Sequence, residues 1–161
     1  RQTYCSMCSR LRRGILYRTA TELGCTKVAL GHHRDDTITT LLMNLLYSGS
    51  IKAMPPRLTS DDGRNIVIRP LIRCAEDDIR TLAEGLGFPI QPCTVCSRQP
   101  DLKRAKIEQL IAELHADNPN VRGNLFAALS NVMPSHLMDR SLQPDEARGD
   151  DEALASLEGC G

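Results

Sequence analysis

Lys27-Val-Ala-Leu-Gly-His-His-Arg-Asp-Asp36 is the stretch that decides the fold of this chain. Its first four residues form a short apolar run typical of a buried strand, and Gly31 ends that run where the chain must turn. Apolar residues then recur at helical spacing from Ile38 onward, so a helix is predicted to open at Asp35 or Asp36. The two histidines and two aspartates are therefore predicted to lie on a loop between a strand and a helix.

Helical and strand patterns alternate along the rest of the chain. A second strand is predicted at residues 65–69, and helices are predicted at residues 9–23, 35–46, 75–86, 103–115 and 121–132. Short strands separated by helices favour an α/β fold with a parallel sheet and flanking helices. Ligands of such sheets bind at the carboxyl ends of the strands, which is where the Gly31 to Asp36 loop is expected.

Length and composition favour one domain followed by a tail. The 161 residues, 41% of them hydrophobic, suffice for one moderate core, which we expect within residues 1–138. Residues 139–161 carry seven acidic side chains against Arg140 and Arg148, and we expect this tail to be disordered. There is no apolar run long enough to cross a bilayer and no signal peptide, so we expect a soluble, cytoplasmic protein.

Two Cys-x-x-Cys motifs, Cys5-Ser-Met-Cys8 and Cys93-Thr-Val-Cys96, are the strongest chemical signal. Seven cysteines without an export signal favour metal binding over a disulfide framework. Thiolate pairs can hold an iron–sulfur cluster, and they can equally form a four-cysteine zinc site with only a structural role. We expect Cys25 and Cys74 to be small core residues, and Cys160, in the tail, to have no role.

The carboxylates of the Gly31 to Asp36 loop have two possible roles. Aspartates at a helix N-terminus often serve only as caps. A carboxylate there can also hold magnesium at a nucleotide or act as a general base, and an imidazole can donate a hydrogen bond to a phosphate. The chain contains no glycine-rich phosphate loop. The chain also begins with Arg1 and not with Met, so we expect its N-terminal part, with that loop, to be absent.

Basic residues gather near the start of the chain. Residues 1–20 hold five arginines and no acidic residue, although the whole chain has 20 basic and 20 acidic side chains. Such a cluster can attract a phosphate backbone, or it can be an ordinary solvated helix face. Aromatic residues make up only 3% of the chain, so RNA binding here would depend on cations and shape more than on base stacking.

Several motifs together resemble one known family. They are Cys5-Ser-Met-Cys8-Ser-Arg-Leu-Arg-Arg-Gly, Leu30-Gly-His-His-Arg-Asp-Asp, Met54-Pro-Pro, Ile68-Arg-Pro-Leu71, Pro92-Cys-Thr-Val-Cys96 and Asn131-Val-Met-Pro-Ser-His-Leu137. In this order and spacing they resemble the tRNA 2-thiocytidine synthetases of the PP-loop ATPase superfamily. The resemblance covers residues 3–138 and leaves out the acidic tail. The family's Ser-Gly-Gly-x-Asp-Ser pyrophosphate loop, which should precede Cys5, is absent, so we expect the chain alone to bind ATP poorly.

The resemblance implies an enzyme that spends ATP to replace the C2 oxygen of cytidine-32 in tRNA with sulfur. It implies a four-iron four-sulfur cluster, Mg²⁺, a cysteine desulfurase as sulfur donor and a possible homodimer. The implied residues are Cys5, Cys8 and Cys96 (alternatively Cys93) as cluster ligands, Asp36 as catalytic acid or base, Gly31, His32 and Asp35 at the nucleotide and magnesium, and Arg10, Arg12 and Arg13 at the RNA. Two alternatives are a zinc-stabilised RNA-binding module without catalysis and a related tRNA thiolase that acts on another nucleoside.

Overall fold

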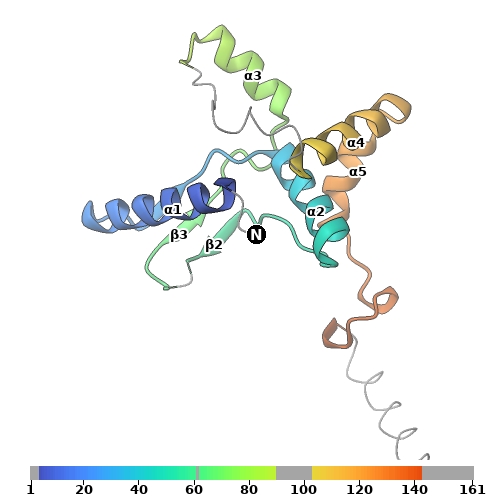
Figure 1. Cartoon of the computed structure of the whole chain (residues 1–161), viewed down its shortest axis with the longest axis horizontal. Coiled ribbons are helices and arrows are strands. Elements are labelled where there is room, and N and C mark those ends of the chain that lie inside the picture. The colour runs from blue at the N-terminus through green and yellow to red at the C-terminus, as the bar shows by residue number, and fades with distance from the viewer. Residues whose placement is uncertain (1–3, 61, 90–102, 143–161) are drawn as a thin grey trace, which may run out of the picture. The chain divides into compact units, whose positions relative to one another are not determined.

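A computed structural model describes residues 4–60, 62–89 and 103–142 of the chain. Its contacts divide the chain into two compact units, Arg1–Phe126 and Ala127–Gly161. The first unit contains all the strands and most of the helices (Figure 1). The fold is α/β, as predicted. The helices are α1 (Tyr4–Glu22), α2 (Arg34–Ser48), α3 (Glu76–Gly85), α4 (Lys103–Asp117) and α5 (Val121–Ala128), and the strands are β1 (Lys27–Ala29), β2 (Arg57–Thr59) and β3 (Ile66–Ile68).

The sheet has the order β1-β3-β2. Strands β1 and β3 pair in parallel, with Ala29 opposite Ile68, and the N–H of Leu30 continues the ladder to the Ile68 carbonyl at 2.9 Å. This pairing confirms the predicted parallel strands. Because the two strands run in the same direction, the residues that follow them, including the histidine and aspartate loop, lie at the same edge of the sheet.

Strand β2 is a difference from the predicted all-parallel sheet. It pairs antiparallel with β3, Leu58 opposite Val67, in a region for which no strand was predicted. The connection is closed by the Ser60 hydroxyl, which accepts from the Asn65 N–H at 3.0 Å, and by Gly63 at φ 72°, a left-handed conformation that favours glycine. β2 is Arg57-Leu58-Thr59, with one apolar residue and all three side chains exposed, so it lacks the apolar run that predicted β1 and β3, and only the pairing with β3 identifies it.

The hydrophobic core joins α2 to α4. Ile38 and Leu42 of α2 pack with Ile107 and Ile111 of α4, and three of these four side chains are no more than 2% exposed. Met43, Leu125 and Phe126 cover the cluster from its side. The i, i+4 spacing of the isoleucines and leucine places each apolar pair on one face of its helix. This contact fixes the start of α4 against the start of α2, where the charged site lies.

The second unit is described only in part. It contains two short 3-10 helices, η2 (Pro134–His136) and η3 (Arg140–Leu142). Helix α5 ends at Ala128, four residues earlier than predicted. The tail was predicted to be disordered from Asp139, but its first residues form η3, in which Asp139 accepts a hydrogen bond from the Ser141 N–H at 2.9 Å. Residues 143–161 lie outside the described part.

Candidate functional site

The loop after β1 leads into α2 through a reciprocal cap. His33 is the N-cap residue, with extended backbone dihedrals of −121° and −177°. Its ring Nδ1 accepts from the Asp36 N–H at 3.4 Å, and Asp36 Oδ2 accepts from the His33 N–H at 3.1 Å. The prediction that Asp35 or Asp36 opens the helix was therefore one or two positions late. The reason is that a histidine, an unusual cap, takes the position that Asp, Asn, Ser or Thr normally fills.

Asp35 is the buried member of the aspartate pair. Its residue is 6% exposed, and each carboxylate oxygen accepts one hydrogen bond, Oδ2 from the Glu76 N–H at 2.8 Å and Oδ1 from Arg122 Nη1 at 2.5 Å. Burial alone would raise the pKa of Asp35, but the bonds from Glu76 and Arg122 and the charge of Arg34 outweigh it and lower that pKa. Asp35 thus ties the start of α2 to α3 and α5 as a carboxylate.

We expect Asp35→Asn to lower the free energy of unfolding at pH 7 by about 2 kcal/mol, because it leaves the Arg122 charge without its partner. The folded-state pKa of Asp35 lies below the unfolded value of about 4. The stabilisation is therefore complete above about pH 4 and is lost as the pH falls through the folded-state pKa. Urea unfolding at pH 7 and at pH 2.5 measures this difference. Asp78→Asn, at an exposed aspartate of α3, is the control, and an equal effect of both variants at pH 7 would contradict the expectation.

Asp36 is held by a second arginine, Arg104 of α4. Its Oδ1 accepts from Arg104 Nη2 at 2.5 Å, and Arg104 Nε donates to Glu108 Oε1 at 2.8 Å within α4. The Asp36 side chain is 15% exposed and that of Arg104 is 44% exposed. Burial opposes the charge of Arg104, but the bonds to Asp36 and Glu108 raise its pKa above the ordinary value. One aspartate therefore faces α5, and the next faces α4.

His32 lies beside the end of β3. Its Nδ1 accepts from Arg69 Nε at 3.3 Å, and Arg69 also donates from Nη1 to the Pro55 carbonyl at 2.6 Å. Burial lowers the pKa of His32, and the charges of Arg69, Arg104 and His33 lower it further against the opposing effect of Asp36. The ring is therefore neutral at pH 7. Because a guanidinium only donates, the ring proton lies on Nε2, and His32 can donate from that atom.

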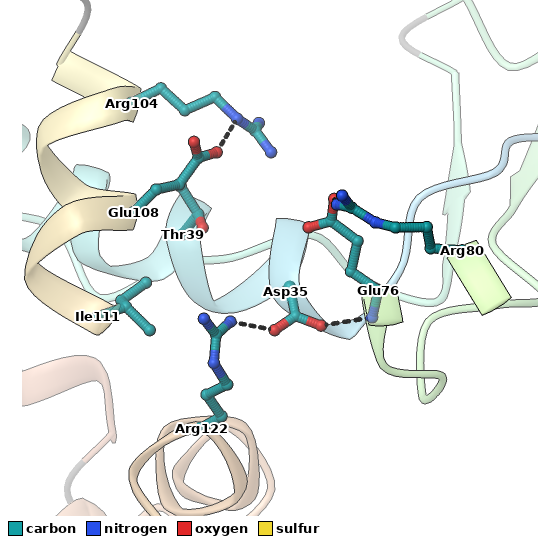
Figure 2. Close-up of a pocket in the computed structure, with 8 residues that line it drawn as sticks. All are labelled: Asp35, Thr39, Glu76, Arg80, Arg104, Glu108, Ile111 and Arg122. Atoms are coloured by element: carbon teal, nitrogen blue, oxygen red, sulfur yellow. Dashed lines mark hydrogen bonds and ion pairs between the residues drawn. The ribbon is translucent and has the colours of Figure 1, made fainter. Parts of the chain in front are cut away.

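A cavity of about 250 Å³ opens beside these groups (Figure 2). Figure 2 shows the Arg122 side chain reaching Asp35 from α5, and the Arg104 side chain beside Glu108 on α4. The cavity is lined by three arginines and three acidic side chains, so the formal charges of its lining sum to zero. The lining residues are Asp35, Thr39, Glu76, Arg80, Arg104, Glu108, Ile111 and Arg122.

The structure locates the predicted cysteines only in part. Cys5 and Cys8 are positions of α1, three residues apart, and Cys8 is exposed with a free thiol. Cys93 and Cys96 lie outside the described residues, so the ligand set stays a prediction. The prediction that Cys25 is a core residue is wrong: it is exposed, because the turn at Gly24 places it at the surface end of β1. Cys74 is half-buried.

The described part of the chain brings no three His, Cys, Asp or Glu side chains into a common metal site. Within that part, no helix is both long and apolar enough to span a membrane.

Arg10, Arg12 and Arg13 are all exposed on α1, as an RNA-facing surface requires. Gly31 is also exposed, and the space beside its Cα is open.

Sequence reasoning missed three arginines of the site. Arg69, Arg104 and Arg122 hold His32, Asp36 and Asp35 respectively, across 37, 68 and 87 residues of sequence. Arg69 lies inside the quoted Ile68-Arg-Pro-Leu71 motif and carried a local signal. Nothing near Arg104 or Arg122 in the sequence indicates an aspartate partner, because that pairing depends on how the helices pack.

Comparisons with known proteins give one consistent result. The chain is 54% identical over 166 residues to a tRNA-cytidine(32) 2-sulfurtransferase of Anaeromyxobacter dehalogenans, covering 99% of this chain and 57% of that protein. Two further proteins of the same name also match. The one from Sorangium cellulosum is 60% identical, covering 88% of this chain and 50% of that protein. The one from Paraburkholderia phymatum is 59% identical, covering 89% of this chain and 43% of that protein. This chain thus spans about half the length of the curated relatives. No protein-family model matches it.

A solved structure shares the fold. It is the U34-tRNA thiolase NcsA from Methanococcus maripaludis with its [4Fe-4S] cluster, which superposes with a TM-score of 0.63 over 85% of this chain and 46% of that chain. The sequences are 23% identical, so this similarity concerns the fold alone. It agrees with the α/β architecture.

Proposed function

This chain belongs to the family of the tRNA-cytidine(32) 2-sulfurtransferases, and from that premise we propose that its protein uses ATP to replace the C2 oxygen of cytidine-32 in tRNA with sulfur. The observation that carries the proposal is sequence identity of 54–60% to three proteins of that name. The charged loop supports it, because His32, Asp35 and Asp36 meet at the carboxyl end of a parallel strand, where α/β folds bind nucleotides.

The residues of the loop have separate proposed roles. Asp36 is the catalytic acid or base, half-buried at the start of α2. Gly31 and His32 contact the nucleotide, the glycine through its exposed backbone and the neutral histidine by donating from Nε2 to a phosphate oxygen. Asp35 helps to hold the Mg²⁺ ion. Since both its oxygens already accept a bond, it fits Mg²⁺ through its remaining lone pairs or through water, which Mg²⁺ commonly keeps.

The cysteines fit a [4Fe-4S] cluster. Cys5 and Cys8 supply two thiolates from α1, and Cys96, or alternatively Cys93, supplies the third. The exposed, free thiol of Cys8 is consistent with a metal ligand. Held by these three thiolates, the cluster would supply an iron without a protein ligand, at which an external sulfur atom could bind. ATP activates the C2 oxygen as an adenylate, and the loop donors stabilise the charge of the departing pyrophosphate.

The remaining proposals concern partners. Arg10, Arg12 and Arg13 contact the tRNA backbone, because all three are exposed cations on the same helix as Cys8. A cysteine desulfurase supplies the sulfur, the enzyme works in the cytoplasm, and it forms a homodimer. Each of these proposals depends on the family and not on a described contact.

Nucleoside analysis tests the proposal. Deleting the gene should remove 2-thiocytidine from bulk tRNA, and the full-length gene should restore it. Loss of a different thionucleoside would favour a related thiolase that acts on another nucleoside. Purified protein that holds zinc without labile sulfide, together with unchanged thionucleosides, would favour the structural RNA-binding module.

A further inference from the structure

We propose that Arg104 is a positioning residue that fixes the carboxylate of Asp36 for the reaction. The inference rests on the proposed function, because it takes Asp36 as the reacting group. Nothing in the sequence near Arg104 indicates this role. Three features of the structure support it. Both carboxylate oxygens of Asp36 accept hydrogen bonds, and Arg104 is itself held in place by its own contacts. An ion pair as exposed as this one also contributes little to the free energy of folding.

Both oxygens of Asp36 are engaged by different elements. Oδ2 accepts from the His33 N–H at 3.1 Å, and Oδ1 accepts from Arg104 Nη2 at 2.5 Å. The first bond belongs to the start of α2 and the second to the start of α4. Hydrogen bonds to both oxygens restrict rotation of the carboxylate about the Cβ–Cγ bond, so its free lone pairs keep one direction.

Arg104 is itself fixed. Its Nε donates to Glu108 Oε1 at 2.8 Å, one turn along α4, while Nη2 reaches Asp36. The helix that carries it is anchored by Ile107 and Ile111, which are 2% and 1% exposed in the core with α2. The guanidinium therefore transmits the position of a packed helix to the aspartate, as supporting residues around a reacting group must do.

Stability alone does not account for this pair. The Arg104 side chain is 44% exposed, and ion pairs with such exposure contribute about 0 to 1 kcal/mol to folding. Arg80 offers a comparison within the same cavity lining: it donates to Glu76 at 2.8 Å with the same i, i+4 spacing as Arg104 and Glu108. Arg104 forms the same kind of pair within its helix, with Glu108, but it also donates to Asp36, which lies 68 residues away in the sequence.

Steady-state thiolation of tRNA by the full-length protein tests the role. We expect Arg104→Ala to lower kcat by about 10- to 100-fold with the KM for ATP and tRNA and the iron content unchanged. Arg104→Lys should recover part of the rate, and added guanidinium ions should partly rescue Arg104→Ala. Arg64→Ala is the control, because it removes an exposed arginine that pairs with Asp62 at 3.3 Å between β2 and β3, and it should be within twofold of the unmodified protein. An unchanged kcat in Arg104→Ala, or a loss explained by KM or iron, would overturn the proposal.

A double variant separates positioning from an independent role. If Arg104 acts through Asp36, then Asp36→Ala with Arg104→Ala should be no slower than Asp36→Ala alone, since only one function is being lost. Multiplied losses in the double variant would overturn the proposal. Unchanged thiolation by Asp36→Ala would overturn it as well.

A readout without activity distinguishes this proposal from the proposed function. The His33 N–H is bonded to the Asp36 carboxylate, so its hydrogen exchange reports whether that carboxylate is held. Exchange at His33 should accelerate several-fold in Arg104→Ala and stay unchanged in Arg64→Ala. If exchange responds in this way but the unmodified protein thiolates no nucleoside, the positioning contact stands and the assigned reaction fails. Equal exchange in both variants would overturn the contact itself.

Discussion

Cys8→Ala should abolish tRNA thiolation, with a residual rate below about 1% of that of the unmodified full-length protein, because it removes one of the three thiolates that we propose as ligands of the cluster. The brown absorbance of the cluster and the iron and labile sulfide content should fall together with the rate. Cys5→Ala should behave in the same way, since Cys5 and Cys8 are positions of one helix, three residues apart.

Cys25→Ala is the control for this experiment. Cys25 is also exposed with a free thiol, but it follows the turn at Gly24 and belongs to neither Cys-x-x-Cys motif. It should keep its iron and its rate. Normal 2-thiocytidine formation by the Cys8→Ala protein would show that the cluster assignment is wrong. Zinc in place of iron and sulfide in the unmodified protein would identify the site as a structural one.

Asp36→Ala should lower the thiolation rate by about 10²- to 10⁴-fold, the usual loss when a general acid or base is removed. The cluster should be retained, because within the described residues Asp36 is bonded to His33 and Arg104 and to no cysteine thiol. Rate and iron content measured on the same preparation separate the two effects. Asp78→Ala, at an exposed aspartate in the first turn of α3, is the control.

The experiment on Asp36 must also separate the loss of catalysis from the loss of stability, because Asp36 caps α2. Since Asp36 completes the cap of α2, its loss also costs about 1 kcal/mol of stability. Asp36→Asn keeps a side-chain oxygen for the His33 N–H while removing the charge. If Asp36→Asn recovers the thermal stability but not the rate, Asp36 is catalytic. If the rate recovers together with the stability, its role is structural.

The parts of this molecule that the sequence predicted are those decided within a few residues. β1 and β3 are short apolar runs bounded by a turn or a proline, and α2, α3 and α4 follow apolar residues at helical spacing. The strand-to-helix loop was predicted because Gly31 separates two different periodicities. Strand β2 was missed because Arg57-Leu58-Thr59 holds only one apolar residue, and Cys25 was misplaced because residue type does not fix which side of a turn faces solvent.

The sequence by itself determined the α/β class, the position of the histidines and aspartates after β1, and the family of the chain, because each depends on residues that are neighbours along the backbone. Only the tertiary structure decided which cations face the aspartates. Arg104 and Arg122 reach Asp36 and Asp35 across 68 and 87 residues, once Ile107 and Ile111 have packed against Ile38. An arginine can pair with any nearby carboxylate, so its partner is chosen by the packing of apolar helix faces and not by its own chemistry.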